Sequence, residues 1–290
     1  MKSCLMAVFV ALLLAPVAAR AGAFVPDQGF YRVYQQDRLL GVERISFEQH
    51  SDSLVVTSKV RQRLPRGPSQ QDTLAKTAML VLGIKDGAWR SYQSYEQLNR
   101  DELTRILTVT DTTYTSYRQG SEGGFGDTFE CPPGRVYVVD PQVFVLFDVL
   151  CRDMHAQGFE ERPVTLLYVT ARDTAITARV KRLGKGPLKV GNETITAEKF
   201  SITDPWSEFF VWVSPNGRML RLTLPAVGLR VDRDPASLKG SHVLQALTPV
   251  LPGIPSVTMG LDPKLSPQPS KNGAASTTPK RAPTPATPGH

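Results

Sequence analysis

Alternation of apolar and polar residues over positions 54–64 is the feature that most constrains the fold of this 290-residue chain. The apolar residues fall on even positions: Leu54, Val56, Val60 and Leu64. Polar and basic residues fall on odd positions: Thr57, Lys59, Arg61 and Arg63. Because successive side chains of a strand point to opposite faces, this pattern predicts an antiparallel strand with one buried face and one exposed face.

Short turn signals separate many similar segments. They are Gln36-Asp37, His50-Ser51-Asp52, Lys85-Asp86-Gly87, Gly191-Asn192 and Pro215-Asn216-Gly217. The Asn-Gly pair suits the positive φ angles of a tight turn. We therefore expect an all-β, mainly antiparallel fold of about twelve strands, mostly neighbours in sequence. Such an order favours a curved meander sheet or an incomplete β-barrel.

One segment departs from this alternation. Asp140-Pro141 is typical of a helix N-cap followed by proline at the first helical position. The apolar residues that follow, up to Cys151, recur at helical spacing. We expect one helix at about 141–152, packed in or over the sheet. The glycine-rich segment 120–126 lacks the strand–helix context of a nucleotide-binding turn and predicts a mobile connector.

Residues 1–21 have the three parts of a secretory signal peptide. Lys2 supplies the positive charge, Leu5–Val17 is apolar, and Ala19-Arg20-Ala21 is a cleavage signal. The apolar run is shorter than the roughly 20 residues of a membrane-spanning helix, which disfavours the alternative of a retained anchor. The sequence predicts an exported protein, periplasmic or secreted, without a transmembrane segment after cleavage.

The remaining chain divides into a single β domain at 22–260 and a tail at 261–290. The tail is rich in Pro, Ser, Thr and Ala, which predicts disorder; it is either a spacer that contacts the envelope or a terminus without function. It carries four of the basic residues. Without the signal and residues 263–290, which carry those four, 28 basic residues stand against 27 acidic ones. Nucleic-acid binding requires a basic face, so this class is excluded.

Two cysteines, Cys131 and Cys151, follow the signal peptide. An even number in an oxidising compartment favours a disulfide, with two free thiols as the alternative. Their separation disfavours a metal site, and we expect neither metal nor cofactor. Cys151 and His155 combine the residue types of an acyl-transfer pair, but a disulfide would consume the thiol. We assign no catalytic residue and expect a protein that is not an enzyme.

Two groups of short motifs carry a resemblance to a known family. The first is the opening hairpin, with Tyr31-Arg32-Val33, Gly41 and Ile45-Ser46-Phe47; the second is Ala197–Phe200 with Val211–Arg218. Both resemble bacterial envelope domains of unknown function that are similar to the periplasmic lipoprotein carriers. The resemblance implies a curved antiparallel half-barrel over an apolar cavity, with the 141–152 helix in or over it. It does not imply lipoprotein transport, because no defining carrier residue aligns.

The segment 206–213 is apolar on both faces of the expected strand. Trp206, Phe210 and Trp212 share one face. These residues either belong to a central core strand or line a ligand cavity, with Trp89 and Tyr95 as neighbours.

Three hypotheses for function follow. The leading one is a non-enzymatic periplasmic binding or carrier domain for a hydrophobic small molecule or lipid. The second is an envelope scaffold that binds another protein or a cell-wall polymer through its sheet edges and tail. The third is a hydrolase with an unrecognised site.

Overall fold

The computed structural model describes residues 26–67 and 70–238, so the predicted signal peptide (1–21) and tail (261–290) lie outside the described residues. The first eight strands are β1 (Asp27–Gln35), β2 (Arg38–Gln49), β3 (Ser53–Pro65), β4 (Gln71–Gly83), β5 (Trp89–Leu98), β6 (Asp101–Thr110), β7 (Thr113–Gly120) and β8 (Gly123–Glu130). The remaining elements are β9 (Val136–Val139), α1 (Val145–Gln157), β10 (Glu161–Tyr168), β11 (Thr174–Val190), β12 (Glu193–Thr203), β13 (Glu208–Val213), β14 (Met219–Leu224), η1 (Pro225–Val227), β15 (Leu229–Arg233) and η2 (Pro235–Leu238). No helix in this part of the chain has the length and apolarity to cross a membrane.

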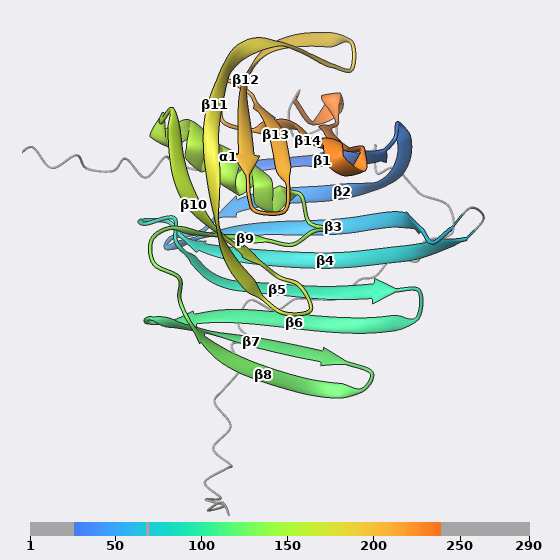
Figure 1. The fold of residues 1–290 in the computed structure, drawn as a ribbon, viewed down its shortest axis with the longest axis vertical. Coiled ribbons are helices and arrows are strands. Elements are labelled where there is room, and N and C mark those ends of the chain that lie inside the picture. Colours follow the sequence, from blue (N-terminus) through green and yellow to red (C-terminus); the bar gives the residue numbers. More distant parts are fainter. Residues whose placement is uncertain (1–25, 68–69, 239–290) are drawn as a thin grey trace, which may run out of the picture. The chain divides into compact units, whose positions relative to one another are not determined.

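All fifteen strands belong to one open, curved sheet with the order β8-β7-β6-β5-β4-β3-β2-β1-β15-β14-β13-β12-β11-β10-β9 (Figure 1). Two meanders, β1–β8 and β10–β15, make up most of this sheet, and β9 is added beside β10. The meanders meet where β1 pairs with β15, so the described strands that come first and last along the chain lie side by side. The predicted class, a curved antiparallel meander or incomplete barrel with one helix, is confirmed, although fifteen strands replace the expected twelve.

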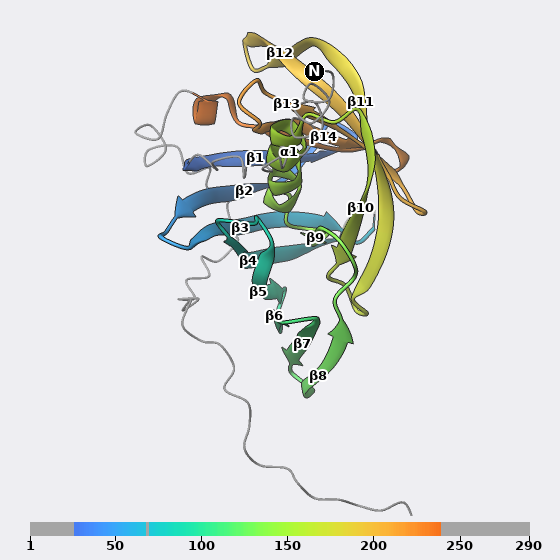
Figure 2. The same ribbon diagram turned by 90° about the vertical axis from the view of Figure 1, so that its left-hand side faces the viewer.

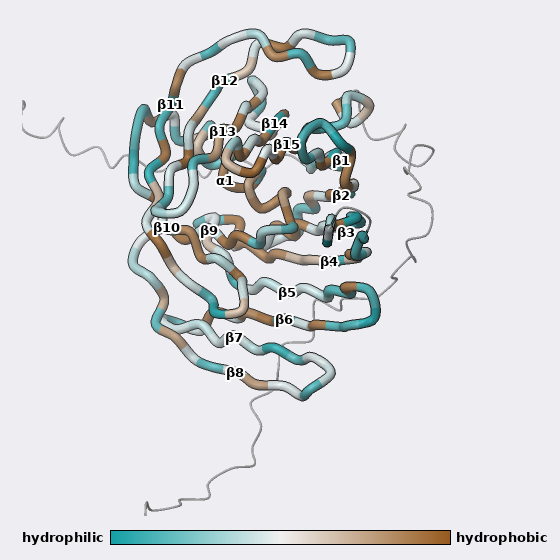
Figure 3. The backbone as a smooth tube through the Cα atoms, turned by 45° about the vertical axis from the view of Figure 1, so that its right-hand side comes forward, coloured by the Kyte–Doolittle hydropathy of each residue, from teal (hydrophilic) through white to brown (hydrophobic). Residues whose placement is uncertain are grey.

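The helix connects the one parallel strand pair of the described sheet, β9 with β10. Parallel strands need a long crossover, and α1 supplies it. α1 packs against β3, β9, β13 and β14. Figure 2 shows the helix between the strands β1–β4 and the strands β10–β13. Apolar residues gather around α1 and β9 in Figure 3.

The main core lies between α1 and the concave side of the sheet. Along β3 the predicted alternation holds, since Leu54, Val56 and Val60 are buried while Lys59 is exposed. α1 is buried on nearly all sides. Its buried apolar residues are Val145, Leu146, Phe147, Val149, Leu150, Cys151 and Met154. The apolar area removed from water on both sides of this contact is the main source of stability for such a layered arrangement.

The helix begins later than predicted, because Asp140 is not its N-cap. The Asp140 carboxylate accepts hydrogen bonds from Tyr92 Oη (2.7 Å) and Lys76 Nζ (2.9 Å). Glu43 of β2 accepts the first helical amides instead, from Phe144 N (2.9 Å) and Val145 N (3.1 Å). A residue about a hundred positions upstream thus satisfies helical donors that a local side chain normally caps.

The predicted mobile connector at 120–126 is instead the β7–β8 hairpin, and that prediction is wrong. The pairing runs without interruption from Thr113↔Glu130 to Gly120↔Gly123. Tyr117 lies over the glycines of β8: a Cβ at position 124 would lie 2.4 Å from its hydroxyl group. An aromatic ring from the neighbouring strand covers glycines that have no side chain to pack, which supports the strand.

Candidate functional site

The cavity described beside α1, on the concave side of the sheet, is small. A cavity lined by residues that include Leu80, Trp89, Tyr137 and Leu146 has a volume of about 10 Å³. A single water molecule needs roughly 10–15 Å³ of such volume. The space beside Trp89 therefore has no room for a lipid or another small molecule.

A buried charge cluster of Asp27, Tyr31, Asp148, Arg152 and Arg233 links α1 to β1 and β15. The Asp148 carboxylate accepts hydrogen bonds from Tyr31 Oη (3.0 Å) and Arg233 Nη1 (3.3 Å). Asp27 accepts one from Arg233 Nη2 at 2.7 Å and one from Arg152. Burial alone would raise the pKa of Asp148, but the guanidinium groups of Arg152 and Arg233 outweigh it and hold this pKa below its usual value. Both acids, Asp27 and Asp148, are paired with guanidinium groups, so the cluster serves the fold.

A second polar cluster joins the segment before α1 to β4 and β5. Lys76 Nζ lies 2.7 Å from an Asp140 oxygen and 2.8 Å from a Glu96 oxygen. Tyr92 donates to Asp140, and burial raises the pKa of Tyr92 well above its ordinary value. Here too each charge has a partner. Within residues 26–67 and 70–238, no three His, Cys, Asp or Glu side chains are grouped to hold a metal ion.

The predicted ligand-lining aromatic residues do not share a cavity. Phe210 and Trp212 of β13 lie on the outer face of the sheet, where Lys199 Nζ is 4.4 Å and 5.0 Å from the centres of their rings. Their neighbours Phe209 and Val211 point inward and are buried. Successive side chains of a strand point to opposite faces, and the helix covers the face of Phe209 and Val211. Phe210 and Trp212 therefore lie on the other face.

The other three predicted residues lie apart from these and from one another. Trp206 precedes β13 and is 65% exposed, at an edge-on contact with Tyr168. Trp89 is buried in the main core against Tyr114. Tyr95 is buried on β5 outside that core. Trp206 is thus an exposed residue, and Trp89 belongs to the core.

The predicted disulfide does not form. Cys131 and Cys151 are both free among the described residues. Cys151 lies inside α1 and is completely buried in the main core, whereas Cys131 follows β8 and is half-buried. Burial raises the pKa of the Cys151 thiol, which keeps it protonated and a poor nucleophile. His155 Nδ1 lies 3.8 Å from Glu198, and no acyl-transfer pair is built.

Alkylation should distinguish the two thiols. In the native protein without reductant, we expect a maleimide to modify Cys131 and to leave Cys151 unmodified, since burial shields Cys151 and raises its pKa. In denaturant without reductant, both should react. Intact-mass measurement gives the count, and a requirement for reductant before either thiol reacts would show that a disulfide exists after all.

The β8 edge, meaning the side of Gly123–Glu130 that faces away from β7, is an exposed edge of the described sheet. Every residue of β8 is exposed. In this part of the chain β8 pairs with β7 and has no second neighbour. An edge strand of this length presents unpaired N–H and C=O groups that can template another strand.

The hydrogen-bond pattern shows which groups are unpaired. Cys131 N donates to Thr112 O across the hairpin at 2.7 Å, so these two residues form a hydrogen-bonded pair. Hydrogen-bonded and non-hydrogen-bonded pairs alternate along an antiparallel ladder. With the observed register, four residues therefore direct their backbone groups away from β7: Gly124, Gly126, Thr128 and Glu130.

Aromatic rings connect this edge to the core. Phe129 stacks on Tyr114 with ring centres 5.1 Å apart, and Tyr114 meets Trp89 edge-on at 5.9 Å. Phe125 holds the guanidinium of Arg118 over its ring at 4.3 Å. Phe125 and Phe129 are 54% and 38% exposed. Both rings lie on the same face of β8, beside the edge at which a further strand would pair.

The opposite edge of the sheet is protected. β9 has four residues, of which Tyr137, Val138 and Val139 are buried. It also packs against β5. A short, covered edge strand gives another chain little to pair with. The sequence pattern did not predict the β8 strand, because its glycines favour a loop. The signal that indicates a hairpin here is the β-forming residues Tyr114 and Tyr117 followed by a short polar turn.

Comparison with known proteins supports the fold and leaves the function open. No family model and no curated protein matches the chain. A solved structure does: the crystal structure of a β-barrel-like protein of domain of unknown function DUF1849 from Brucella abortus, with a TM-score of 0.50, 9% sequence identity, and coverage of 73% of this chain and 95% of that chain. At this identity the likeness shows the fold alone. The similarity to lipoprotein carriers stays a prediction from short motifs, whereas this chain is similar in fold to a bacterial β-barrel-like domain of unknown function.

Proposed function

We propose that this protein is a non-enzymatic scaffold of the bacterial envelope that binds an extended segment of a partner polypeptide at the β8 edge. The observation that carries the proposal is the exposed strand with four outward backbone positions and two exposed phenylalanines. Strand addition uses such groups: the backbone supplies hydrogen bonds, and alternate side chains supply specificity. Export to the periplasm or cell surface is part of the proposal and rests on the signal-like sequence of residues 1–21.

The small size of the cavity beside Trp89 favours the scaffold hypothesis over the carrier hypothesis. The cavity at Trp89 measures about 10 Å³, and the five candidate aromatic residues do not converge. A carrier site for a lipid would need a concave, mostly apolar pocket of roughly 300–1,000 Å³.

The charge of the β8 edge indicates the chemistry of the partner. β8 carries Asp127 and Glu130, its turn carries Glu122, and no Lys or Arg lies between 119 and 134. Pairing with a second copy of β8 would bring these acids together, which is destabilising in a sheet. The partner segment is therefore cationic and extended, and the protein by itself is expected to remain monomeric.

Thr128→Pro tests this proposal. Proline removes an outward N–H at position 128 while the β7 ladder keeps its hydrogen bonds, and edge strands tolerate proline at such positions. Thr128→Val is the matched control, because it keeps the N–H and a similar shape. With a synthetic peptide that alternates valine and lysine as the probe, Thr128→Pro should weaken binding about tenfold, the equivalent of one or two lost hydrogen bonds.

Two further readouts decide the outcome. A peptide with glutamate in place of lysine should bind more weakly than the lysine peptide, and hydrogen exchange at Gly126 and Thr128 should slow on binding. The proposal is contradicted if the lysine peptide does not bind the wild type, or if the proline and valine variants bind it equally.

A further inference from the structure

Three cations lie close together on the outer face of β2 and β3. Arg44 of β2 is directly opposite Lys59 of β3, and Arg61 follows Lys59 by two residues on the same face. Side chains directly opposite each other in a sheet have Cβ atoms roughly 4.5–5.5 Å apart, and residues two apart on a strand are separated by roughly 7 Å. Arg44 and Lys59 are exposed, and Arg61 is half-buried. These three residues are called the basic row below.

The basic row has no acid to balance it in the described part of the chain. None of its three residues forms an ion pair with an aspartate or a glutamate of residues 26–67 and 70–238. Their cross-strand neighbours on β1 and β4 are the uncharged Phe30, Thr77 and Ala75. Beside the row, the carboxylate of Asp234 is already paired with Arg32, at 2.6 Å. The positive charge of the row therefore faces solvent.

The same face of the sheet is built differently on β14 and β15. There, Asp232 accepts hydrogen bonds from Arg221 on the neighbouring strand and from Arg230 at 3.1 Å. Opposite charges across a strand pair stabilise a sheet, whereas like charges directly opposite each other destabilise it. Arg44 and Lys59 form such a like-charge pair. The stability of the fold does not account for this pair, so we look for its role in binding.

From this arrangement we infer that the basic row binds a linear polymer that carries phosphate groups. Guanidinium groups match phosphate oxygens with two parallel hydrogen bonds, and the ammonium of Lys59 adds a point charge. A row of cations along a strand suits a chain with an anionic group on each repeating unit. Because we propose export, the source of the polymer is the cell envelope, although the binding chemistry does not depend on export.

A lipid bilayer fits the basic row less well than a polymer. Binding to a membrane surface combines attraction to anionic lipids with apolar side chains that enter the bilayer. The apolar neighbours of the row, Val42 and Ala75, are buried, at 7% and 5% exposure. The row thus offers charge without an apolar group that could insert beside it.

Titration calorimetry with inorganic polyphosphate tests the inference. We expect the double variant Arg44→Gln with Arg61→Gln to weaken binding about tenfold, because two phosphate contacts are lost. The slope of log K against log salt should also become shallower, by about 1–2. Both positions lie on the outer face, and the change removes the repulsion between Arg44 and Lys59. The thermal midpoint should therefore equal or exceed that of the wild type.

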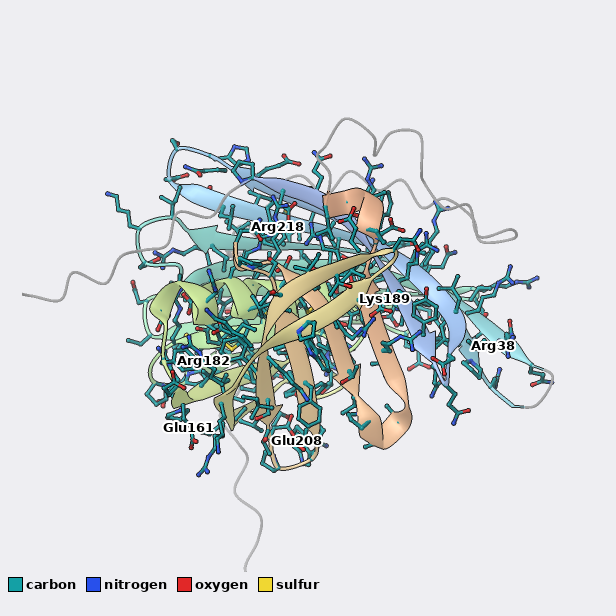
Figure 4. All side chains as sticks on the ribbon, turned by 90° about the horizontal axis from the view of Figure 1, so that it is seen from above. Arg38, Glu161, Arg182, Lys189, Glu208 and Arg218 are labelled. Atoms are coloured by element: carbon teal, nitrogen blue, oxygen red, sulfur yellow. The ribbon has the colours of Figure 1, made fainter. Side chains whose placement is uncertain are left out.

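Lys181→Gln with Lys189→Gln is the matched control. It removes the same amount of charge from exposed positions of β11, and five strands separate β11 from β2 in the sheet. Figure 4 labels Lys189 on β11 and Arg38 at the start of β2. This control should bind polyphosphate nearly as the wild type does.

The inference is overturned if polyphosphate does not bind the wild type, or if the control variant loses as much affinity as the row variant. Binding to vesicles of phosphatidylglycerol without binding of polyphosphate would also overturn it, in favour of a membrane. The Thr128→Pro variant should bind polyphosphate like the wild type, so this test is independent of the strand-pairing proposal.

Discussion

Asp148→Ala should lower the free energy of unfolding by about 3–5 kcal/mol, the usual effect of removing one partner from a buried ion pair. Asp148 is fully buried in α1, and so is Arg233 in β15. Without Asp148, the Arg233 guanidinium and the Tyr31 hydroxyl lose their shared acceptor. Met219 N loses its acceptor too, at 2.8 Å. Chemical denaturation of the purified domain measures the effect.

Two control variants calibrate this result. Glu160→Ala removes the acid of an exposed pair with Arg182, in which the Glu160 side chain is 80% exposed, and should change stability by less than about 1 kcal/mol. Tyr31→Phe removes one hydrogen bond to Asp148 and should cost about 1 kcal/mol. An Asp148→Ala effect no larger than that of Glu160→Ala would show that the cluster does not stabilise the fold.

The contribution of Asp148 to stability also depends on pH. Its pKa is lower in the folded protein than in the unfolded chain, so the folded state binds its proton less tightly. The stabilisation is present above the ordinary aspartate pKa of about 3.9 and is lost as the pH falls through the folded-state value. This term acts in the acid range and not near neutral pH.

Glu43 should make the protein less stable as the pH rises from about 5 to about 8. Burial raises the pKa of Glu43 to about 7 from 4.5, against the lowering effect of the hydrogen bonds from Ser58, Val145 and Phe144. The folded state therefore holds this proton more tightly than the unfolded chain. Ionisation in this pH range should reduce the free energy of unfolding by about 2–3 kcal/mol.

Glu43→Gln should remove this dependence on pH. Glutamine is neutral throughout and keeps one oxygen for the helical amides of Phe144 and Val145, although its NH₂ group replaces the second acceptor. Denaturant midpoints at pH 5, 6.5 and 8 and constant ionic strength give the slope. Glu48→Gln, on the same strand and exposed, is the matched control and should retain the wild-type slope. An unchanged slope in Glu43→Gln would assign the dependence to another group.

Strand alternation was the most informative pattern in the sequence. The even positions of 54–64 are those that face the core, because a two-residue period specifies the buried face wherever the strand lies. The helical stripe from Val143 to Cys151 similarly identified the one segment that covers the sheet. Both patterns reflect the local geometry of a strand or a helix, which sets the spacing of apolar residues along the chain.

The candidate sites depended on contacts that a local pattern does not contain. Phe209 and Phe210 are equally apolar, yet the helix covers Phe209 and leaves Phe210 with Lys199 on the outer face. The β8 edge depends on the order of the fifteen strands, since a strand lies at an edge when a second strand does not pair with its other side. The even number of cysteines after the signal peptide made a Cys131–Cys151 pair plausible, but in the structure Cys151 is buried in the core and both thiols are free.

The sequence by itself determined the antiparallel sheet, the mostly sequential order of its strands and the helix that packs on it, because hydrophobic period and turn residues act over a few positions. Only the tertiary structure decided how that helix begins and what holds it in place. Glu43 replaces Asp140 as the acceptor for the first helical amides, and Asp27 with Arg233 provides the charges around Asp148. These partners lie about a hundred residues away or more in most cases, and burial strengthens their electrostatic interactions once folding has brought them together.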